Sequence, residues 1–253
     1  MRDDFADRYG PWAVIAGASE GIGECFARRV AAAGVRPVLV ARNEAKLRAL
    51  ADDLPVESRV AAVDLTAPDV LDALAPALDG IDVGLLVYNA GADPFASQFL
   101  DQPLESWAGL VRRNVGTVLA ACHFYGSAMA ARGRGGIVLV TSGAAWAGGA
   151  YIAAYSASKA FDLILGEALW AELHPLGVDV LSMVLGPTDT PAFRRVLHGR
   201  DFEGIADPDD VARHLLDNVA EGPTWPPDGS PFGPMPRRQA VELMSEGSAF
   251  LAD

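Results

Sequence analysis

The stretch WAVIAGASEGIG runs from Trp12 to Gly23 and joins an apolar segment to a glycine-rich turn. Its first part, Trp12–Ala16, is bounded by glycine and proline, which predicts a short buried strand. The following segment, Glu24–Ala33, has a helical composition and ends at a glycine. Strand, glycine turn and helix in this order indicate an α/β fold.

The glycines of this turn have the spacing Gly-x-x-x-Gly-x-Gly, at Gly17, Gly21 and Gly23. The first permits a tight turn, and the other two allow close approach of backbone and helix. Unpaired N–H groups at the start of the helix can then hold a pyrophosphate. Glycines after a strand are otherwise plain turn residues, but this context favours a dinucleotide site that also includes Ser19 and Ile22.

The rest of the chain alternates apolar runs with helical segments. Runs that are apolar without alternation are typical of parallel strands covered on both faces. Right-handed crossovers then predict a doubly wound parallel β-sheet flanked by helices on both faces, with ligands at the carboxyl ends of the strands. We expect a single domain over residues 1–253. The further predicted strands are Pro37–Ala41, Arg59–Val63, Val83–Tyr88, Gly136–Val140 and Val178–Leu185.

A candidate reaction centre lies in the second half of the chain. Tyr155 and Lys159 are four positions apart, so on a helix they share one face. A free tyrosine has a pKa of about 10, and a neighbouring ammonium favours its phenolate, as general acid–base catalysis requires. Ser142 follows an apolar run and can supply a hydroxyl to a substrate oxygen. An isolated pair of this kind usually only decorates a helix surface, but the glycine turn favours the catalytic interpretation.

These motifs and several others resemble the short-chain dehydrogenase/reductase family, in its single-domain branch with a Rossmann-type sheet. The additional matches are Asp64-Leu65, Tyr88-Asn89-Ala90-Gly91, Asn114 in Arg-Arg-Asn-Val-Gly, and Leu185-Gly186-Pro187-Thr188-Asp189-Thr190. The resemblance implies that Asn114 completes a catalytic tetrad with Ser142, Tyr155 and Lys159 by holding a water that relays protons. It also implies cofactor contacts at Asp64, Leu65, Asn89, Ala90, Gly91, Tyr155, Lys159, Pro187, Thr188 and Thr190.

Three of these residues also have plain structural interpretations. Asp64 can cap a turn, Asn114 can be an ordinary polar residue inside a long helix, and Thr190 can be a helix N-cap before Pro191. The chain also departs from the family pattern. Tyr88 and Leu185 replace the usual asparagine and proline, and the familiar acidic-glycine-glycine ending is missing.

The end of the second predicted strand bears on cofactor choice. An acidic residue there would bind both ribose hydroxyls of NAD, whereas a nearby arginine accommodates the 2′-phosphate of NADP. This chain has Ala41 followed by Arg42, which favours NADP. Glu20 in the glycine turn argues the other way, because this position is often basic in NADP-dependent relatives, so NAD stays possible.

Composition excludes several other classes of protein. The formal net charge of −13 opposes nonspecific binding to nucleic acid or to an anionic membrane. Two cysteines give no disulfide framework and no zinc spacing, so we expect no metal site and a reducing compartment. No secretory signal or apolar stretch of transmembrane length is evident. A cytoplasmic location is therefore expected.

The remaining predictions concern substrate and assembly. Apolar residues in the interval 191–205 predict a lid over a medium-sized apolar substrate, with Phe95, Trp146 and Tyr151 as further candidates for the pocket. Long apolar helices over 107–131 and 153–174 predict a homodimer or homotetramer. The extension 221–253 begins with a Pro/Gly-rich part, Glu221–Pro236, that can contain a short seventh strand, and a helix is predicted at Arg237–Ser245.

Together these patterns predict an oxidoreductase that interconverts a ketone and a secondary alcohol, with Tyr155 as general acid or base and NADP(H) as the favoured cofactor. Two alternatives stay open. One is a 3-oxoacyl-thioester reductase, and the other is a noncatalytic dinucleotide-binding sensor.

Overall fold

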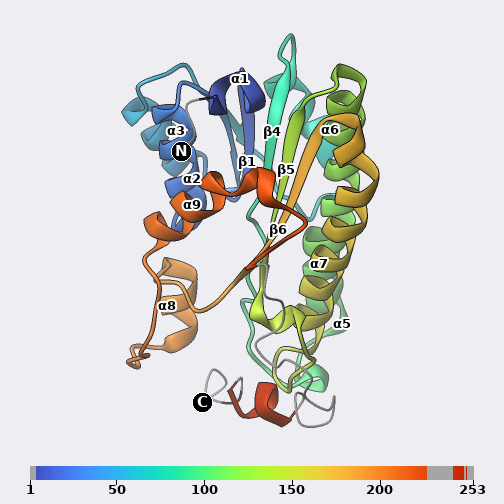
Figure 1. Cartoon of the computed structure of the whole chain (residues 1–253). Coiled ribbons are helices and arrows are strands. Elements are labelled where there is room, and N and C mark those ends of the chain that lie inside the picture. The colour runs from blue at the N-terminus through green and yellow to red at the C-terminus, as the bar shows by residue number, and fades with distance from the viewer. Residues whose placement is uncertain (1–3, 227–241, 248, 250–253) are drawn as a thin grey trace.

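The computed structural model describes residues 4–226, 242–247 and 249. Its centre is a parallel sheet of seven strands in the order β3-β2-β1-β4-β5-β6-β7 (Figure 1). The doubly wound parallel sheet predicted from the sequence is confirmed. The strands are β1 (Trp12–Ala16), β2 (Arg36–Ala41), β3 (Arg59–Ala62), β4 (Val83–Tyr88), β5 (Gly135–Ser142), β6 (Val178–Leu185) and β7 (Thr224–Trp225).

The strands form where continuous apolar runs can be covered on both faces. All five residues of β1 and all six of β4 are buried, as such runs require. Four strand boundaries differ from the prediction by one or two residues, because β2 begins at Arg36, β3 stops at Ala62 and β5 runs from Gly135 to Ser142. The short seventh strand is present and pairs with β6 through Ser182 and Met183.

Helices cover both faces of the sheet, and each face has its own apolar core. One face is covered by α1 (Phe5–Tyr9), α2 (Ile22–Ala32), α3 (Glu44–Asp53) and α9 (Pro208–Asp217). The other is covered by α4 (Val70–Leu78), α6 (Thr117–Arg132) and α7 (Ala153–Leu173). Two more helices are α5 (Leu104–Val111) and α8 (Pro191–Leu197). Short 3₁₀ turns are Phe99–Asp101, Gly143–Ala145, His174–Leu176 and Val219–Glu221.

The prediction of one continuous helix over 107–131 is wrong, because the segment is interrupted. The structure has α5, then a π-helical turn at Arg112–Gly116, then α6. A π-turn widens the backbone hydrogen-bond ladder locally and occurs most often at functional sites. Here the widened turn contains Asn114, whose side chain is completely buried. The second long helix, predicted to His174, ends as an α-helix at Leu173.

The topology sets the position of the site. The chain order reverses between β1 and β4, which are neighbours in the sheet, and Ala16 pairs with both Val40 and Tyr88. Their carboxyl ends therefore lie at one edge of the sheet, where α/β proteins bind their ligands. In the described part of the chain, no helix combines the length and the apolarity that crossing a membrane would require.

The carboxyl-terminal predictions have mixed outcomes. Residues 242–247 are helical, as predicted for the end of the segment Arg237–Ser245. The rest of that predicted helix, residues 237–241, lies outside the described residues. The backbone N–H of Ala150 donates to Ser245 Oγ at 3.0 Å, which ties the helical segment 242–247 to the loop before α7.

Candidate active site

A groove of about 1270 Å³ follows the carboxyl edge of the sheet. Most of the predicted site residues contribute to its wall, although they come from seven separate parts of the chain. The predicted residues that line it are Gly17, Ser19, Ile22, Arg42, Asp64, Leu65, Asn89, Ala90, Gly91, Ser142, Tyr155, Lys159, Pro187, Thr188 and Thr190. Gly21, Gly23 and Asn114 were predicted as well, but they do not line the groove.

The glycine turn has the close packing that a phosphate-binding turn needs. Gly17 and Gly21 have φ angles of +87° and +61°, which disfavour any larger residue. A Cβ atom on Gly23 would lie 2.0 Å from the carbonyl oxygen of Gly17. Asn89 Nδ2 donates to the same oxygen at 3.3 Å, so the turn is held against the end of β4. The start of α2 can therefore approach an anion through its backbone.

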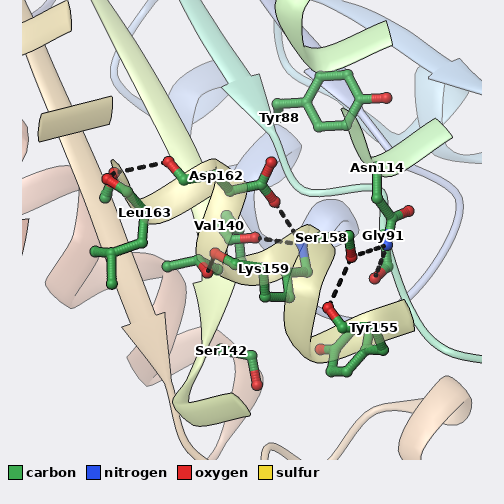
Figure 2. A network of polar contacts seen from close by, with 12 residues as sticks. Tyr88, Gly91, Asn114, Val140, Ser142, Tyr155, Ser158, Lys159, Asp162 and Leu163 are labelled. Carbon is green, nitrogen blue, oxygen red and sulfur yellow. Dashed lines mark hydrogen bonds and ion pairs between the residues drawn. The ribbon is translucent and has the colours of Figure 1, made fainter. Parts of the chain in front are cut away.

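Three of the predicted catalytic residues line the groove together, from the end of β5 and the start of α7. Lys159 is 3% exposed, and its Nζ donates to the carbonyl oxygen of Val140 at 2.9 Å and to Asp162 Oδ2 at 3.1 Å. Ser142 Oγ accepts a hydrogen bond from Ala144 N at 3.2 Å. Figure 2 shows the Lys159 ammonium between Asp162 on one side and Tyr155 with Ser142 on the other. The ammonium is thus fixed by buried partners, while Tyr155 and Ser142 line the groove.

Asn114 links the π-turn to α7 and to the loop after β4. Its Nδ2 donates to the Gly91 carbonyl oxygen at 3.2 Å and to Ser158 Oγ at 3.1 Å, and its Oδ1 accepts from Arg113 Nε at 2.9 Å. The side chain is therefore fully engaged in holding three segments together. The water relay that the family resemblance implies for Asn114 stays a prediction.

The structural interpretations of Asp64 and Thr190 also hold. Asp64 Oδ1 accepts from the backbone N–H of Thr66 at 2.9 Å, and this hydrogen bond lowers the pKa of the Asp64 carboxyl. The Thr190 hydroxyl accepts from Phe193 N at 3.1 Å and caps α8. Both residues line the groove as well, so the capping and ligand-binding roles are compatible.

Several residues at the groove were not predicted from the sequence. Lys46 lines it beside Arg42 and donates to Glu20 Oε2 at 2.7 Å. Arg113 Nη2 donates to the Ala92 carbonyl oxygen at 2.6 Å, and burial lowers the pKa of its guanidinium. Leu243 and Met244 of the helical segment 242–247 also line the groove. Lys46 lies in the first turn of α3, four positions after Arg42, and this short distance from the second strand was a usable signal in the sequence.

Glu20, the residue that argued against NADP, does not face the groove as an isolated anion. Its carboxylate accepts hydrogen bonds from Arg195 on α8 and from Lys46 on α3. These partners, Arg195 foremost, hold the pKa of Glu20 below its usual range. The residues of the groove thus fit a nicotinamide dinucleotide: the glycine turn could hold the pyrophosphate through its backbone, and Arg42 and Lys46 after β2 could hold a phosphate on the ribose.

Comparison with known proteins agrees with this geometry. The family model for short-chain dehydrogenases matches residues 11–201. The 7β-hydroxysteroid dehydrogenase of Collinsella aerofaciens is 34% identical over 200 residues, which cover 78% of this chain and 76% of the relative. The very-long-chain 3-oxoacyl-CoA reductase of Pyricularia oryzae is 36% identical over 179 residues, or 68% of this chain and 54% of the relative.

A solved structure from a study of 7β-hydroxysteroid dehydrogenase stereoselectivity superimposes with a TM-score of 0.86 at 28% identity. The match covers 95% of this chain and 98% of that one. The fold, the groove and the sequence matches lead to one conclusion: this chain belongs to the short-chain dehydrogenase family, the NAD(P)-dependent oxidoreductases that act on CH–OH and C=O groups.

Proposed function

We propose that this protein is an NADP(H)-dependent dehydrogenase that interconverts a ketone and a secondary alcohol on a steroid-sized apolar substrate. The observation that carries the proposal is the joint placement of Tyr155, Ser142 and Lys159 along one groove with both a polar and an apolar end. A noncatalytic sensor would need the cofactor cradle but not the reacting side chains.

The chemistry follows from what these side chains can do. When bound, a nicotinamide cofactor would supply the hydride for ketone reduction and accept it in alcohol oxidation. Tyr155 gives a proton to the substrate oxygen during ketone reduction and takes it back during alcohol oxidation. Ser142 donates a hydrogen bond to that oxygen as negative charge develops on it. The Lys159 ammonium, held by the Val140 carbonyl, favours the phenolate form that oxidation uses.

The apolar end of the groove supports a bulky hydrophobic substrate. Its wall includes Phe193, Val196 and Phe202 from the α8 region, and Leu243 with Met244 from the segment 242–247. The rings of Phe193 and Phe202 pack edge to face at 5.6 Å. We assign the interval 191–205 as the substrate lid of a single domain. The similarity to a 7β-hydroxysteroid dehydrogenase favours a hydroxysteroid as the substrate class.

The preference for NADP rests on charge at the end of β2. Ala41 ends the strand without a carboxylate, and Arg42 and Lys46 line the groove directly after it. An added phosphate would meet Arg42 there, with Lys46 close by in its ion pair with Glu20, whose charge Arg195 also offsets.

The activity is tested with purified protein on a panel of hydroxysteroids, oxosteroids, simple secondary alcohols and 3-oxoacyl thioesters, by absorbance of the reduced cofactor. We expect turnover of at least one steroid, and a loss of at least about 100-fold in kcat for Tyr155→Phe. Full activity of Tyr155→Phe would overturn the proton-transfer role. Cofactor binding without turnover would favour the sensor.

The panel also decides the second candidate function. The similarity to a very-long-chain 3-oxoacyl-CoA reductase supports a 3-oxoacyl-thioester reductase. In that case coenzyme A or acyl-carrier thioesters should exceed the steroids in kcat/KM by at least about tenfold, a difference of roughly 1.4 kcal/mol in transition-state binding.

Cofactor preference is tested by kcat/KM with NADPH and NADH. Arg42→Ala should lower the value for NADPH by about 10-fold to 100-fold and leave the value for NADH nearly unchanged, because the arginine acts only on the phosphate. Arg48→Ala is the matched control, since Arg48 is another exposed arginine close by, on α3, and lies outside the groove. A higher kcat/KM of the unaltered protein with NADH would contradict the NADP assignment.

A further inference from the structure

The proposed function leaves one buried charged group unused, namely Asp162 on α7. Asp162 lies three positions after Lys159, on the same face of the helix, and is 2% exposed. Its Oδ2 accepts a hydrogen bond from Lys159 Nζ at 3.1 Å. Its other oxygen, Oδ1, is buried and has no hydrogen-bond partner among the described residues. Among the described residues, Lys159 is therefore the hydrogen-bond partner of the Asp162 carboxylate.

Asp162 contacts that lysine from behind. Lys159 and Val140 line the groove, whereas Asp162 does not. Figure 2 shows the same arrangement, with Asp162 and the phenol of Tyr155 on opposite sides of the ammonium. A substrate or cofactor in the groove would thus meet Lys159 and never touch the carboxylate. Any effect of Asp162 on the reaction must pass through Lys159.

The ion pair of Lys159 and Asp162 is not explained by a gain in folding stability. A buried carboxylate with one unpartnered oxygen carries a large desolvation cost, and buried ion pairs are often no better than apolar residues of similar volume. Burial raises the pKa of Asp162, while the charge of Lys159 and its hydrogen bond oppose that effect. The Lys159 ammonium already has the Val140 carbonyl as an acceptor. The carboxylate therefore adds chiefly a negative charge beside the catalytic cation.

We propose that Asp162 is a positioning residue that holds the Lys159 ammonium at the base of the groove and offsets its positive charge. This inference rests on the proposed function, in which Lys159 favours the phenolate of Tyr155. A carboxylate behind the ammonium weakens that effect, so the wild-type chain needs a higher pH for alcohol oxidation than one with a neutral residue at 162. The reaction is thereby biased toward ketone reduction near neutral pH, since reduction uses the protonated phenol.

Other titratable groups surround the pair of Lys159 and Asp162. Tyr88 faces it from β4 and Cys122 from α6, and burial raises the pKa of both, that of Cys122 to about 12. Arg113 approaches Tyr88 from the π-turn, and its charge is fixed by hydrogen bonds to Ala92 and Asn114. From β5 and β6 the neighbours are the uncharged Val140 carbonyl and Ser182. Of these titratable groups, Asp162 is the one that forms a hydrogen bond with Lys159.

The test compares Asp162→Asn, which keeps the size and an acceptor oxygen, with Asp162→Leu, which removes both charge and acceptor. The first readout needs no turnover. The ultraviolet absorbance of phenolate is titrated with pH in each chain and in its Tyr155→Phe counterpart, and the difference isolates Tyr155 from the other tyrosines. We expect the midpoint to fall by about one pH unit in both variants. Unchanged midpoints in both variants would overturn the proposal.

The second readout is the pH profile of kcat for alcohol oxidation with NADP⁺. Its acidic limb should move to lower pH by the same amount in Asp162→Asn. Asp179→Asn is the matched control, because Asp179 is equally buried but pairs with Arg8 and Tyr9 far from the groove. An Asp162→Asn profile equal to that of wild type, or an Asp179→Asn profile shifted equally, would show that the carboxylate acts only on folding. If wild type lacks turnover, the proposed function fails, while the absorbance titration still decides the role of Asp162.

Discussion

Gly23 is packed so closely against the glycine turn that no larger residue fits there. The added methyl of Gly23→Ala would lie 2.0 Å from the Gly17 carbonyl oxygen and 2.8 Å from Asn89 Nδ2. Because the first contact is with backbone, the turn itself must move, so we expect loss of cofactor binding by at least about tenfold and destabilisation of about 1–3 kcal/mol. Calorimetric titration with NADPH and thermal unfolding measure both effects.

The control for this prediction is Gly109→Ala in α5. Gly109 is also helical, but its nearest non-local atom is Arg112 Nη2 at 3.9 Å, an ordinary contact. This variant should bind NADPH normally and unfold at an equal or higher temperature, because alanine favours helices. Equal binding by both variants would contradict the role of Gly23 in shaping the turn.

Asp93 should make the folding stability of the protein depend on pH. Burial raises the pKa of its carboxyl above the ordinary aspartate value of about 4, against an opposing hydrogen bond from Phe95 N at 2.9 Å. Between these two pKa values the folded chain binds a proton more tightly than the unfolded chain. The contribution of Asp93 to stability is therefore present below the unfolded pKa and is lost as the pH rises through the folded pKa.

The measurement compares wild type with Asp93→Asn by denaturant unfolding from about pH 4 to pH 7. The wild type should lose stability relative to the variant as the pH increases through this window. A stability difference that stays constant, or that changes in favour of the wild type, would show that Asp93 keeps an ordinary or lowered pKa in the folded protein.

Single residues also show what the sequence alone can establish. The spacing of Tyr155 and Lys159 was informative because helix geometry fixes which residues share a face. The same rule applied to Asp162, but an aspartate at this spacing looks like any surface ion pair until its burial is known. Burial depends on the packing of α7 against β5, β6 and α6, which the local sequence does not contain.

At the scale of elements, strands were easier to predict than helix irregularities. Continuous apolar runs fix a buried strand to within one or two residues, as β1 and β4 illustrate. The π-turn at Arg112–Gly116 was missed because the sequence on both sides has the same helical composition. What stabilises the turn is a set of non-local hydrogen bonds from Asn114 to Gly91 and Ser158.

Three elements of the groove are joined by one carboxylate. Glu20 of the glycine turn binds Lys46 on α3 and Arg195 on α8, so we call this group the Glu20 bridge. Glu20→Gln should release Lys46 toward the 2′-phosphate and lower the KM for NADPH by about threefold to tenfold, since a nearby negative charge is removed. Hydrogen exchange at the amides of α8 should become faster, because one of its anchors is lost.

Glu24→Gln is the control for the Glu20 bridge. Glu24 is also a surface glutamate near the glycine turn, but it pairs within α2 with Arg28 and lies outside the groove. It should change neither the KM for NADPH nor exchange in α8. Slower exchange in α8 of Glu20→Gln, or an unchanged KM, would contradict the bridge.

At the scale of the whole molecule, the sequence identified the edge of the sheet that carries the site but not the shape of the groove. Topology alone brings Asn89, Ser142 and Gly186 to one edge, because each lies at or directly after the carboxyl end of a parallel strand. The apolar end of the groove depends on Leu243 and Met244, which are distant in the sequence from the other lining residues. No pattern of apolar residues in the sequence indicates that the segment 242–247 lies at the groove.

The outer face of α5, α6 and α7 supports the prediction of an oligomer. It carries several exposed apolar side chains, whereas apolar residues of α2 and α9 are mostly buried against the sheet. Figure 1 shows α5, α6 and α7 together on one side of the molecule. Such a face is typical of a surface covered by a second copy. Its exposed apolar residues are Leu104, Val111, Leu119, Phe124 and Ile164.

We therefore expect light scattering at micromolar concentration to give a mass of two or four times 26.5 kDa. Ile164, which is 61% exposed, is the residue to change. Ile164→Glu places a charge where a partner would need an apolar contact, so it should shift the mass toward the single chain and lower the unfolding temperature at low concentration. Ala32→Glu adds the same charge at the end of α2, on the opposite face, and should leave the mass unchanged. A single-chain mass for the wild-type protein would show that this apolar face is not covered by a second copy.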